Sequence, residues 1–408
     1  MHILFLTDNF PPEGNAPATR TYEHAREWVQ LGHDVTVITC APNFPEGVLF
    51  DGYKNKWYQR EEMEGIKVVR VKTYITANEG FVKRILDYIS FGVTGGIAGF
   101  FQTRPDVVVS TSPQFFCACG AWVLSVIRGK PWVFELRDIW PASITAVGAM
   151  EKSTIIRMLE KLEMFLYRRA DRIVSVTNSF KAELIERGID GNKIDVVING
   201  VDLSKYSPAA TKDPALAEQY GLAGKFVVGY IGTHGMAHAL DRVLDTAELL
   251  QDQKDIRVLF AGGGAERASL ERQAEERGLG NVVMMPRQPK AMMPSVWSLC
   301  DISLISLRDT PLFTQVIPSK IFESMGMGLP MVIACPRGEA AEIIESTGSG
   351  VAVPAEDPAS LAGCIGELYA DRERLEALAK ASGSSAEQYD RKRQAESMLD
   401  SLLKAASC

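Results

Sequence analysis

The sequence has few cysteines, no long apolar run and no excess of positive charge. Its seven cysteines are scattered, and Cys117 and Cys119 lack the second pair that a zinc site needs, so we expect reduced thiols. No uninterrupted apolar run reaches the roughly 18 residues of a membrane-spanning helix, so we expect none. The net charge of −7 argues against a dedicated nucleic-acid-binding protein.

The beginning of the chain and its charge distribution set further expectations. Met1–Asp8 has the pattern of a strand that enters a polar turn, without a basic stretch or a cleavage pattern, so we expect no signal peptide and a cytoplasmic protein. Residues 1–200 contain 23 basic and 23 acidic residues, so the negative excess lies in the second half. A neutral first half suits an anionic partner, although evenly scattered charge is the commoner explanation.

Strand-like apolar runs alternate with helical periods along the whole chain. This alternation predicts the α/β class, with two doubly wound, Rossmann-like domains of parallel strands and a ligand cleft between them. We expect strands at residues 2–6, 34–39, 67–72, 107–110, 132–136, 173–176, 193–198, 226–232, 257–260, 282–285, 302–307, 331–334 and 350–353. The longer helices are expected at 17–31, 81–102, 115–128, 154–169, 240–250 and 386–404.

A proline-containing linker near Tyr206–Pro214 predicts the domain boundary. The two domains are then residues 1–206 and 207–385, with a last helix over 386–408 that packs back on the first domain. The stretch Tyr88–Thr103 contains no charged residue. It fits a core helix, or a helix that contacts a membrane through four nearby aromatic residues, Phe81, Phe91, Phe100 and Phe101.

The segment Pro318–Pro330 carries the strongest signal for a site. Pro318 suits the first turn of a short helix that follows a strand, and the amino end of such a helix attracts anions. Lys320 then suits a phosphate and Glu323, on nearly the same face, suits ribose hydroxyls. The alternative is a surface lysine and a solvated glutamate on an amphipathic helix.

Two glycine-containing turns also follow strands in the second half. Gly232-Thr233-His234-Gly235 lets backbone amides approach a ligand, and His234 or His238 can donate to a phosphate or a sugar hydroxyl, unless both are merely solvated. In the other turn, Gly262 and Gly264 let the backbone approach a nucleotide closely. The alternative is that they only allow a tight connection between a strand and a helix. A dinucleotide fingerprint is disfavoured there, because Arg267 and Pro286 replace its third small residue and its acid.

The first half contributes two further turns. After the strand at 132–136, Arg137 can counter a phosphate, Asp138 can position a hydroxyl and Trp140 can stack on a sugar ring. The alternative is an Arg–Asp pair in a loop with the tryptophan in the core. After the first strand, Gly14 and Asn15 precede a helix that carries Arg20. These three residues are a second candidate for a ligand site in the first half, or the turn is only a connector.

Together these motifs resemble the family 4 glycosyltransferases of the two-domain GT-B type. The closest resemblance is to the branch that makes bacterial O-antigen or capsule chains, typified by N-acetyl-L-fucosamine transferases. The carriers are the motifs at 11–14, 135–141, 199–202, 232–235, 308–311 and 318–323.

The resemblance implies retention of anomeric configuration, a nucleotide-sugar donor, here UDP-linked, and no essential metal or other cofactor. It implies donor binding by the second domain, where Ser319 and Glu339 complete the donor-binding candidates. It implies acceptor binding by the first domain. The acceptor would be a polyprenyl-diphosphate-linked saccharide at the inner face of the cytoplasmic membrane, where the protein would be peripheral.

The chain departs from the family pattern at the donor-phosphate positions. The first carboxylate of the family's paired-glutamate motif is replaced by Gln315, and the usual Arg and Lys fall on Thr233 and His238. Phosphate contacts therefore shift to Lys320 and the histidines. A front-face transfer without a protein nucleophile follows. The competing functions are a nucleotide-sugar epimerase of the same fold, an NAD-linked oxidoreductase and a non-catalytic nucleotide-sugar-binding protein.

Overall fold

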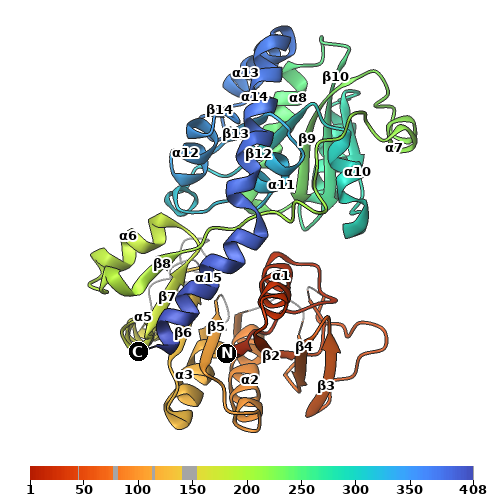
Figure 1. Ribbon diagram of the computed structural model, residues 1–408. Coiled ribbons are helices and arrows are strands. Elements are labelled where there is room, and N and C mark those ends of the chain that lie inside the picture. The colour runs from red at the N-terminus through yellow and green to blue at the C-terminus, as the bar shows by residue number, and fades with distance from the viewer. Residues whose placement is uncertain (45, 77–80, 113–114, 140–153, 408) are drawn as a thin grey trace. The chain divides into compact units, whose positions relative to one another are not determined.

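The computed structural model describes residues 1–44, 46–76, 81–112, 115–139 and 154–407, and they form two compact units (Figure 1). Unit 1 comprises Met1–Ile198 and Arg391–Cys408, and unit 2 comprises Asn199–Asp390. Each unit is an α/β domain built on one sheet of mainly parallel strands. The predicted α/β class, with two domains of mainly parallel strands, is therefore confirmed.

Unit 1 has an eight-stranded sheet in the order β3-β4-β2-β1-β5-β6-β7-β8. All neighbours pair in parallel except β3, which runs antiparallel to β4. The strands are β1 (His2–Leu6), β2 (Asp34–Cys40), β3 (Tyr58–Met63), β4 (Ile66–Val71), β5 (Val107–Thr111), β6 (Trp132–Leu136), β7 (Arg172–Ser175) and β8 (Ile194–Val196). The helices are α1 (Ala16–Gln30), α2 (Phe81–Phe100), α3 (Phe115–Arg128), α5 (Thr154–Arg169), α6 (Asn178–Glu186) and α15 (Arg391–Ala406), with a 3₁₀ turn, η1 (Gly191–Lys193).

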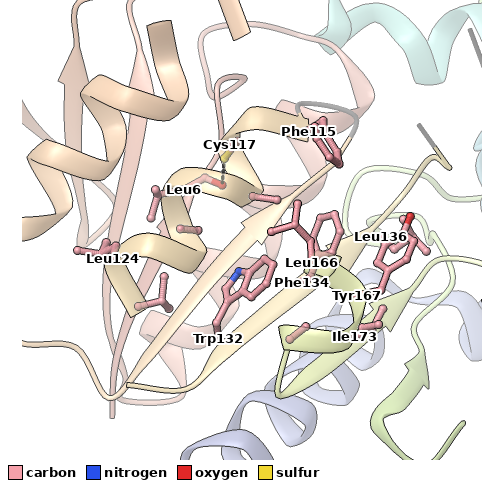
Figure 2. Close-up of a cluster of buried hydrophobic side chains, with 14 of the residues drawn as sticks. Leu6, Phe115, Cys117, Leu124, Trp132, Phe134, Leu136, Leu166, Tyr167 and Ile173 are labelled. Atoms are coloured by element: carbon pink, nitrogen blue, oxygen red, sulfur yellow. Dashed lines mark hydrogen bonds between the residues drawn. The ribbon is translucent and has the colours of Figure 1, made fainter. Parts of the chain in front are cut away.

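The core of unit 1 lies on both faces of its sheet. On one face, α3 and α5 cover the central strands, where Trp132 and Phe134 stack with centroids 5.6 Å apart and Phe134 in turn stacks on Tyr167 (Figure 2). Cys117 of α3 donates from Sγ to the Leu6 carbonyl at 3.2 Å. The strands are apolar because both faces of a parallel sheet are buried.

Unit 2 has a six-stranded, all-parallel sheet in the order β11-β10-β9-β12-β13-β14. Its strands are β9 (Phe226–Thr233), β10 (Ile256–Gly263), β11 (Val282–Met285), β12 (Ile302–Ser306), β13 (Met331–Ala334) and β14 (Gly350–Val353). Its α-helices are α7 (Pro214–Gln219), α8 (Leu240–Leu249), α9 (Arg267–Glu276), α10 (Met293–Ser298), α11 (Lys320–Gly326), α12 (Glu339–Ser346), α13 (Pro358–Ala370) and α14 (Arg372–Ser385). The 3₁₀ turns are η2 (Met236–His238), η3 (Lys290–Met292), η4 (Pro311–Thr314) and η5 (Ala386–Tyr389).

The units divide at residue 198, before the predicted boundary at 206. Val201 donates its N–H to the Tyr389 carbonyl at 3.0 Å. Tyr206 is buried, and a Cβ atom on Gly326 of α11 would lie 3.0 Å from the Tyr206 Cβ. The segment before the linker is thus held by unit 2, through contacts that are remote in the sequence.

The last helix, α15, begins at Arg391 rather than at 386, because residues 386–389 form the turn η5 in unit 2. α15 belongs to unit 1 and contacts α1. The Trp28 indole donates to the Ala395 carbonyl at 2.8 Å, and Arg391 lies 3.1 Å from the Glu23 carboxylate. Among the described residues, no helix combines the length and the apolar character needed to cross a bilayer.

Candidate functional site

The carboxyl edge of the unit 2 sheet brings together the glycine-rich turns that follow β9 and β10. A Cβ atom on Gly262, whose φ is +149°, would lie 1.9 Å from the Gly232 carbonyl oxygen. A Cβ on Gly264 would lie 2.4 Å from the His234 carbonyl oxygen, and the His234 N–H donates to the Gly263 oxygen at 2.9 Å. Contact between the two turns is therefore itself a sufficient reason for glycine at these positions.

Lys320, the first residue of α11, places a buried ammonium group at the same edge. The residue is 9% exposed, and its Nζ lies 3.7 Å from the centroid of the Tyr230 ring. A Cβ on Gly232 would lie 3.0 Å from Nζ, so this glycine leaves space for the lysine. Among the described residues, Nζ has no hydrogen-bond partner. Burial lowers the pKa of Lys320 to about 7, although the Glu323 carboxylate opposes the change.

Two histidines flank this lysine and carry no charge at neutral pH. Burial, with the Arg267 and Lys320 charges, lowers the pKa of His234 to about 4. Burial and the Lys320 charge also lower the pKa of His238 to about 4. The contact of its Nδ1 with the Ser306 carbonyl at 3.3 Å acts in the opposite direction. In the described structure neither ring nitrogen of His234 has a partner. Neutral imidazoles can donate one hydrogen bond each, so Lys320 is the member of this trio that can carry a positive charge near neutral pH.

Arg267, which breaks the dinucleotide pattern, fixes the turn after β10. Its Nη1 donates to the carbonyls of Gly262 and Met285, both at 2.7 Å, and its Nη2 lies 2.5 Å from the Glu271 carboxylate. The guanidinium thus ties the glycine turn to the end of β11. Its role in this structure is to hold the turn's backbone in place.

The motif that begins at Arg308, after β12, joins the turn after β9. Arg308 donates from Nε to the Met236 carbonyl, and its N–H donates to the Ala237 carbonyl at 3.0 Å. The Asp309 N–H donates to Glu356 Oε1 at 3.0 Å. The motif at 308–311 therefore contacts η2, directly after the Gly232–Gly235 turn.

The other donor-binding candidates lie around the same edge. Thr233 ends β9 and is exposed, while Ser319 precedes α11 and makes no capping hydrogen bond with its side chain. Glu323 is half-buried one turn after Lys320, and Glu339, the first residue of α12, is 7% exposed. The site is assembled from the ends of several strands, as in other open α/β sheets.

In unit 1, the side chain of Arg20 is occupied by a buried ion pair. Its Nε donates to Glu135 Oε1 at 2.7 Å, and both side chains are 1% exposed. Its Nη1 and Nη2 donate to the carbonyls of Ile198 and Val197 at 3.1 and 2.9 Å. Burial would raise the pKa of Glu135, but the Arg20 and Arg137 charges outweigh it and lower the pKa. These contacts connect α1, β6 and the end of β8, so they stabilise the fold of unit 1.

Arg137 and Asp138 follow β6 and share a backbone anchor. Their N–H groups donate to Ser112 Oγ at 2.7 and 3.1 Å. Among the described residues, Nη1 of Arg137 is buried without a hydrogen-bond partner. Burial lowers the Arg137 pKa to about 10, with Glu135 acting in the opposite direction. Trp140 lies outside the described residues.

Asn15 has a local role in the structure, whereas no packing contact accounts for Gly14. Asn15 caps α1: its Oδ1 accepts from the Ala18 N–H at 2.9 Å, and its Nδ2 lies 2.5 Å from Asn9 Oδ1. A Cβ on Gly14 would meet nothing within 4 Å. Packing alone therefore does not require glycine at this turn.

Two groups of side chains were not selected from the sequence. Tyr230, beneath the Lys320 ammonium, was read only as part of a buried strand. Near the end of β1, burial raises the pKa of Asp8 to about 8 and that of Asp87 to about 7, and the Glu13 charge adds to both shifts. Asp87 lies on α2, far along the chain, so no local pattern could pair it with Asp8.

Across residues 1–44, 46–76, 81–112, 115–139 and 154–407, no group of three or more His, Cys, Asp or Glu side chains is arranged to hold a metal ion.

Solved structures share the fold of the whole chain. Sucrose-phosphate synthase from Thermosynechococcus elongatus is 16% identical, with a TM-score of 0.77 and coverage of 99% of both chains. Anabaena HepE in complex with UDP and glucose is 18% identical, with a TM-score of 0.73 and coverage of 98% of this chain and 99% of that one. These similarities assign the chain to the GT-B fold class.

Sequence comparison then gives the family. Residues 15–200 match the description "Glycosyl transferase 4-like domain", and residues 225–371 match "Glycosyl transferases group 1". An Escherichia coli K12 protein named as a colanic acid biosynthesis glycosyl transferase, WcaI, is 26% identical over 363 residues, covering 87% of this chain and 88% of that protein. The chain belongs to glycosyltransferase family 4. The narrower resemblance to N-acetyl-L-fucosamine transferases stays a prediction.

Proposed function

We propose that this glycosyltransferase moves an N-acetylated amino sugar from a UDP-linked donor to a polyprenyl-diphosphate-linked saccharide, with retention of configuration, in the synthesis of a bacterial surface polysaccharide. Two similarities support this proposal: the E. coli relative is named for colanic acid biosynthesis, and the Anabaena structure contains UDP and glucose. The peripheral location at the inner face of the membrane is part of the same proposal.

The buried ammonium of Lys320 is the observation that carries the proposal. A buried cation without a counter-ion hydrogen bond costs free energy, and a bound diphosphate would recover that cost. Diphosphate binding would also favour the charged form of Lys320, whose pKa of about 7 leaves it only partly protonated at neutral pH. Lys320 is thus suited to a ligand that brings negative charge to this edge.

The proposed reaction is a front-face transfer. The acceptor hydroxyl oxygen forms a bond to the anomeric carbon as the bond from that carbon to the donor phosphate oxygen breaks. The hydroxyl proton passes to the same phosphate oxygen, so atoms and charges balance without a protein nucleophile. Lys320 stabilises the negative charge that grows on the leaving diphosphate. Neutral His234 and His238 donate hydrogen bonds to the phosphate or to the transferred sugar.

Glu323 and Arg137 have supporting roles in this proposal. Glu323 accepts hydrogen bonds from the ribose hydroxyls of the donor, while Arg137 meets a phosphate of the acceptor and Asp138 positions its hydroxyl. Glu323→Gln should weaken UDP binding about tenfold, the value of a hydrogen bond to a charged group. The same substitution should leave the weaker binding of a ribose-deoxygenated UDP analogue unchanged, as isothermal titration would show. Equal losses for both nucleotides would remove the ribose assignment.

Product analysis tests the proposed function directly. The protein is incubated with UDP-, GDP- and dTDP-sugars, with and without a polyprenyl-diphosphate-linked saccharide, and the products are examined by mass spectrometry and NMR. The proposal expects transfer from a UDP-sugar with the anomeric configuration kept, and undiminished transfer in EDTA. Epimerised nucleotide sugar without acceptor, or binding without any turnover, would contradict it.

A further inference from the structure

Helices α2 and α3 of unit 1 expose an apolar surface that the core does not use. On both helices the exposed apolar side chains recur at helical spacing, with exposed fractions from 38% for Ile89 to 62% for Val126. A helix face turned to water is normally polar. We call this the α2–α3 face, and its members are Leu86, Ile89, Val93, Ile97 and Phe100 of α2, Phe101 directly after it, and Val123, Val126 and Ile127 of α3.

A groove runs along this face because glycines bring the two helices into backbone contact. A Cβ on Gly92 would lie 2.3 Å from the Phe116 carbonyl oxygen, and one on Gly120 would lie 2.2 Å from the Gly92 oxygen. The groove has a volume of about 490 Å³ and extends from Ile89 to Ile127. Its lining is apolar throughout, so it suits hydrocarbon rather than a polar ligand.

The opposite faces of the same helices supply the core. Phe91 of α2 is 1% exposed, and Cys117 of α3 is fully buried (Figure 2). Of the four phenylalanines expected near a membrane, Phe91 is therefore a core residue, whereas Phe100 and Phe101 are 48% and 70% exposed. The side chain of Phe81 is not described. The α2–α3 face is thus additional to what the fold requires.

Basic and aromatic residues surround this face. Residues 83–130 contain five Lys and Arg and two Asp, in a chain whose net charge is −7. Exposed Arg104 donates to the Arg128 carbonyl at the end of α3, and half-buried Arg128 donates to the Gln102 carbonyl just after α2. The Lys130 ammonium, just after α3, lies 3.8 Å from the Asp106 carboxylate. Tyr58 of β3 accepts a hydrogen bond there from Gln102 at 3.1 Å, and Trp57, next to it in the chain, is 73% exposed. Trp, Tyr and basic residues are the side chains typical of a membrane–water interface.

We propose that the α2–α3 face docks onto an anionic phospholipid bilayer, with lipid chains in the groove and Arg104 and Lys130 at the lipid phosphates. The proposal rests on the proposed membrane association and names the surface that performs it. A second copy of the chain would fit this face less well. In a two-fold dimer the basic residues of one copy would face the same basic residues of the other, and like charges repel. An anionic surface complements both the charge and the apolar groove.

Vesicle sedimentation tests the surface with matched variants. Wild type should bind phosphatidylcholine–phosphatidylglycerol vesicles, and Ile97→Glu and Val123→Glu should each lower the partition coefficient at least about tenfold. The control Ile185→Glu changes an exposed apolar residue of α6, 46% exposed, and should bind as wild type does. Replacing both Arg104 and Lys130 by glutamine should lower the partition coefficient about fivefold per charge with vesicles that contain phosphatidylglycerol. The same replacement should change binding to pure phosphatidylcholine vesicles little.

The outcomes separate this surface from the proposed function. Wild type that binds no vesicle would overturn the membrane association itself, and with it the surface. Wild type that binds while both glutamate variants bind equally would overturn the surface alone. A wild-type dimer that Ile97→Glu converts to a monomer, seen by analytical ultracentrifugation, would instead assign the face to a second copy. Far-UV circular dichroism and a thermal unfolding temperature unchanged from wild type would show that unit 1 stays folded in both variants, so that their loss of vesicle binding supports the surface.

Discussion

Lys320 in unit 2 and Arg20 in unit 1 are both buried cations near the start of a helix, but their surroundings differ. Arg20 is 1% exposed and pairs with Glu135 at 2.7 Å. Lys320 is 9% exposed and, among the described residues, has the face of Tyr230 and no hydrogen-bond partner. A buried cation with a partner maintains the fold. A buried cation without one is a cost that a ligand can remove, so it marks a candidate binding site.

Removing Arg20 is the largest expected effect. Arg20→Met leaves the Glu135 carboxylate buried without its ion pair, so the free energy of unfolding of unit 1 should fall by about 3–5 kcal/mol. Urea unfolding followed by tryptophan fluorescence measures this change. The control Arg157→Met alters an exposed arginine of α5 and should change stability little. A loss for Arg20→Met as small as that of the control would show that Arg20 is not structural.

The contact between the glycine turns gives the next largest effect. A Cβ on Gly262 would lie 1.9 Å from a backbone oxygen, and its φ of +149° is unsuited to alanine. Gly262→Ala should therefore destabilise unit 2 by roughly 2–4 kcal/mol and weaken UDP binding. In Gly280→Ala the new methyl group meets nothing within 4 Å, so this control should behave as wild type. Thermal unfolding with and without UDP tests both variants.

Removing Lys320 should change stability in the opposite direction from removing Arg20. The pKa of Lys320 is about 7 in the folded protein and roughly 10.4 when unfolded, so its buried charge destabilises the fold below pH 7. This cost disappears as the pH rises from 7 toward 10. Lys320→Met should therefore raise the free energy of unfolding at pH 6 by roughly 1–2 kcal/mol, and less at pH 9. A destabilised variant at pH 6 would break the contrast with Arg20.

Much of the fold followed from the sequence because parallel strands are apolar on both faces. The strands at 132–136, 282–285 and 331–334 were predicted at their observed bounds. β3 (Tyr58–Met63) was missed because its polar, partly exposed residues do not form an apolar run. Prolines after residue 206 led to a predicted domain boundary there. In the structure Tyr206 packs against α11, and residues from 199 onward belong to unit 2.

The residues of the candidate site that belong to a local motif could be selected from the sequence. Lys320 and the Gly232–Gly235 turn were found from strand–turn–helix patterns, and they lie together at one edge of a sheet. The pairing of Arg20 with Glu135 and the position of Tyr230 under Lys320 were not found. Both depend on contacts between residues far apart in the sequence, which no local pattern contains.

The turnover of Lys320→Met tests the central claim most directly. With the donor identified by the product analysis, kcat for sugar transfer is compared among wild type, Lys320→Met and a control, Lys254→Met. Lys254 is exposed in the turn before β10. Loss of a preorganised charge from the transition state should lower kcat by about 100- to 1,000-fold in Lys320→Met, with thermal stability retained. The control should turn over as wild type does. A folded Lys320→Met protein with wild-type kcat would contradict the assignment of the leaving diphosphate to this ammonium group.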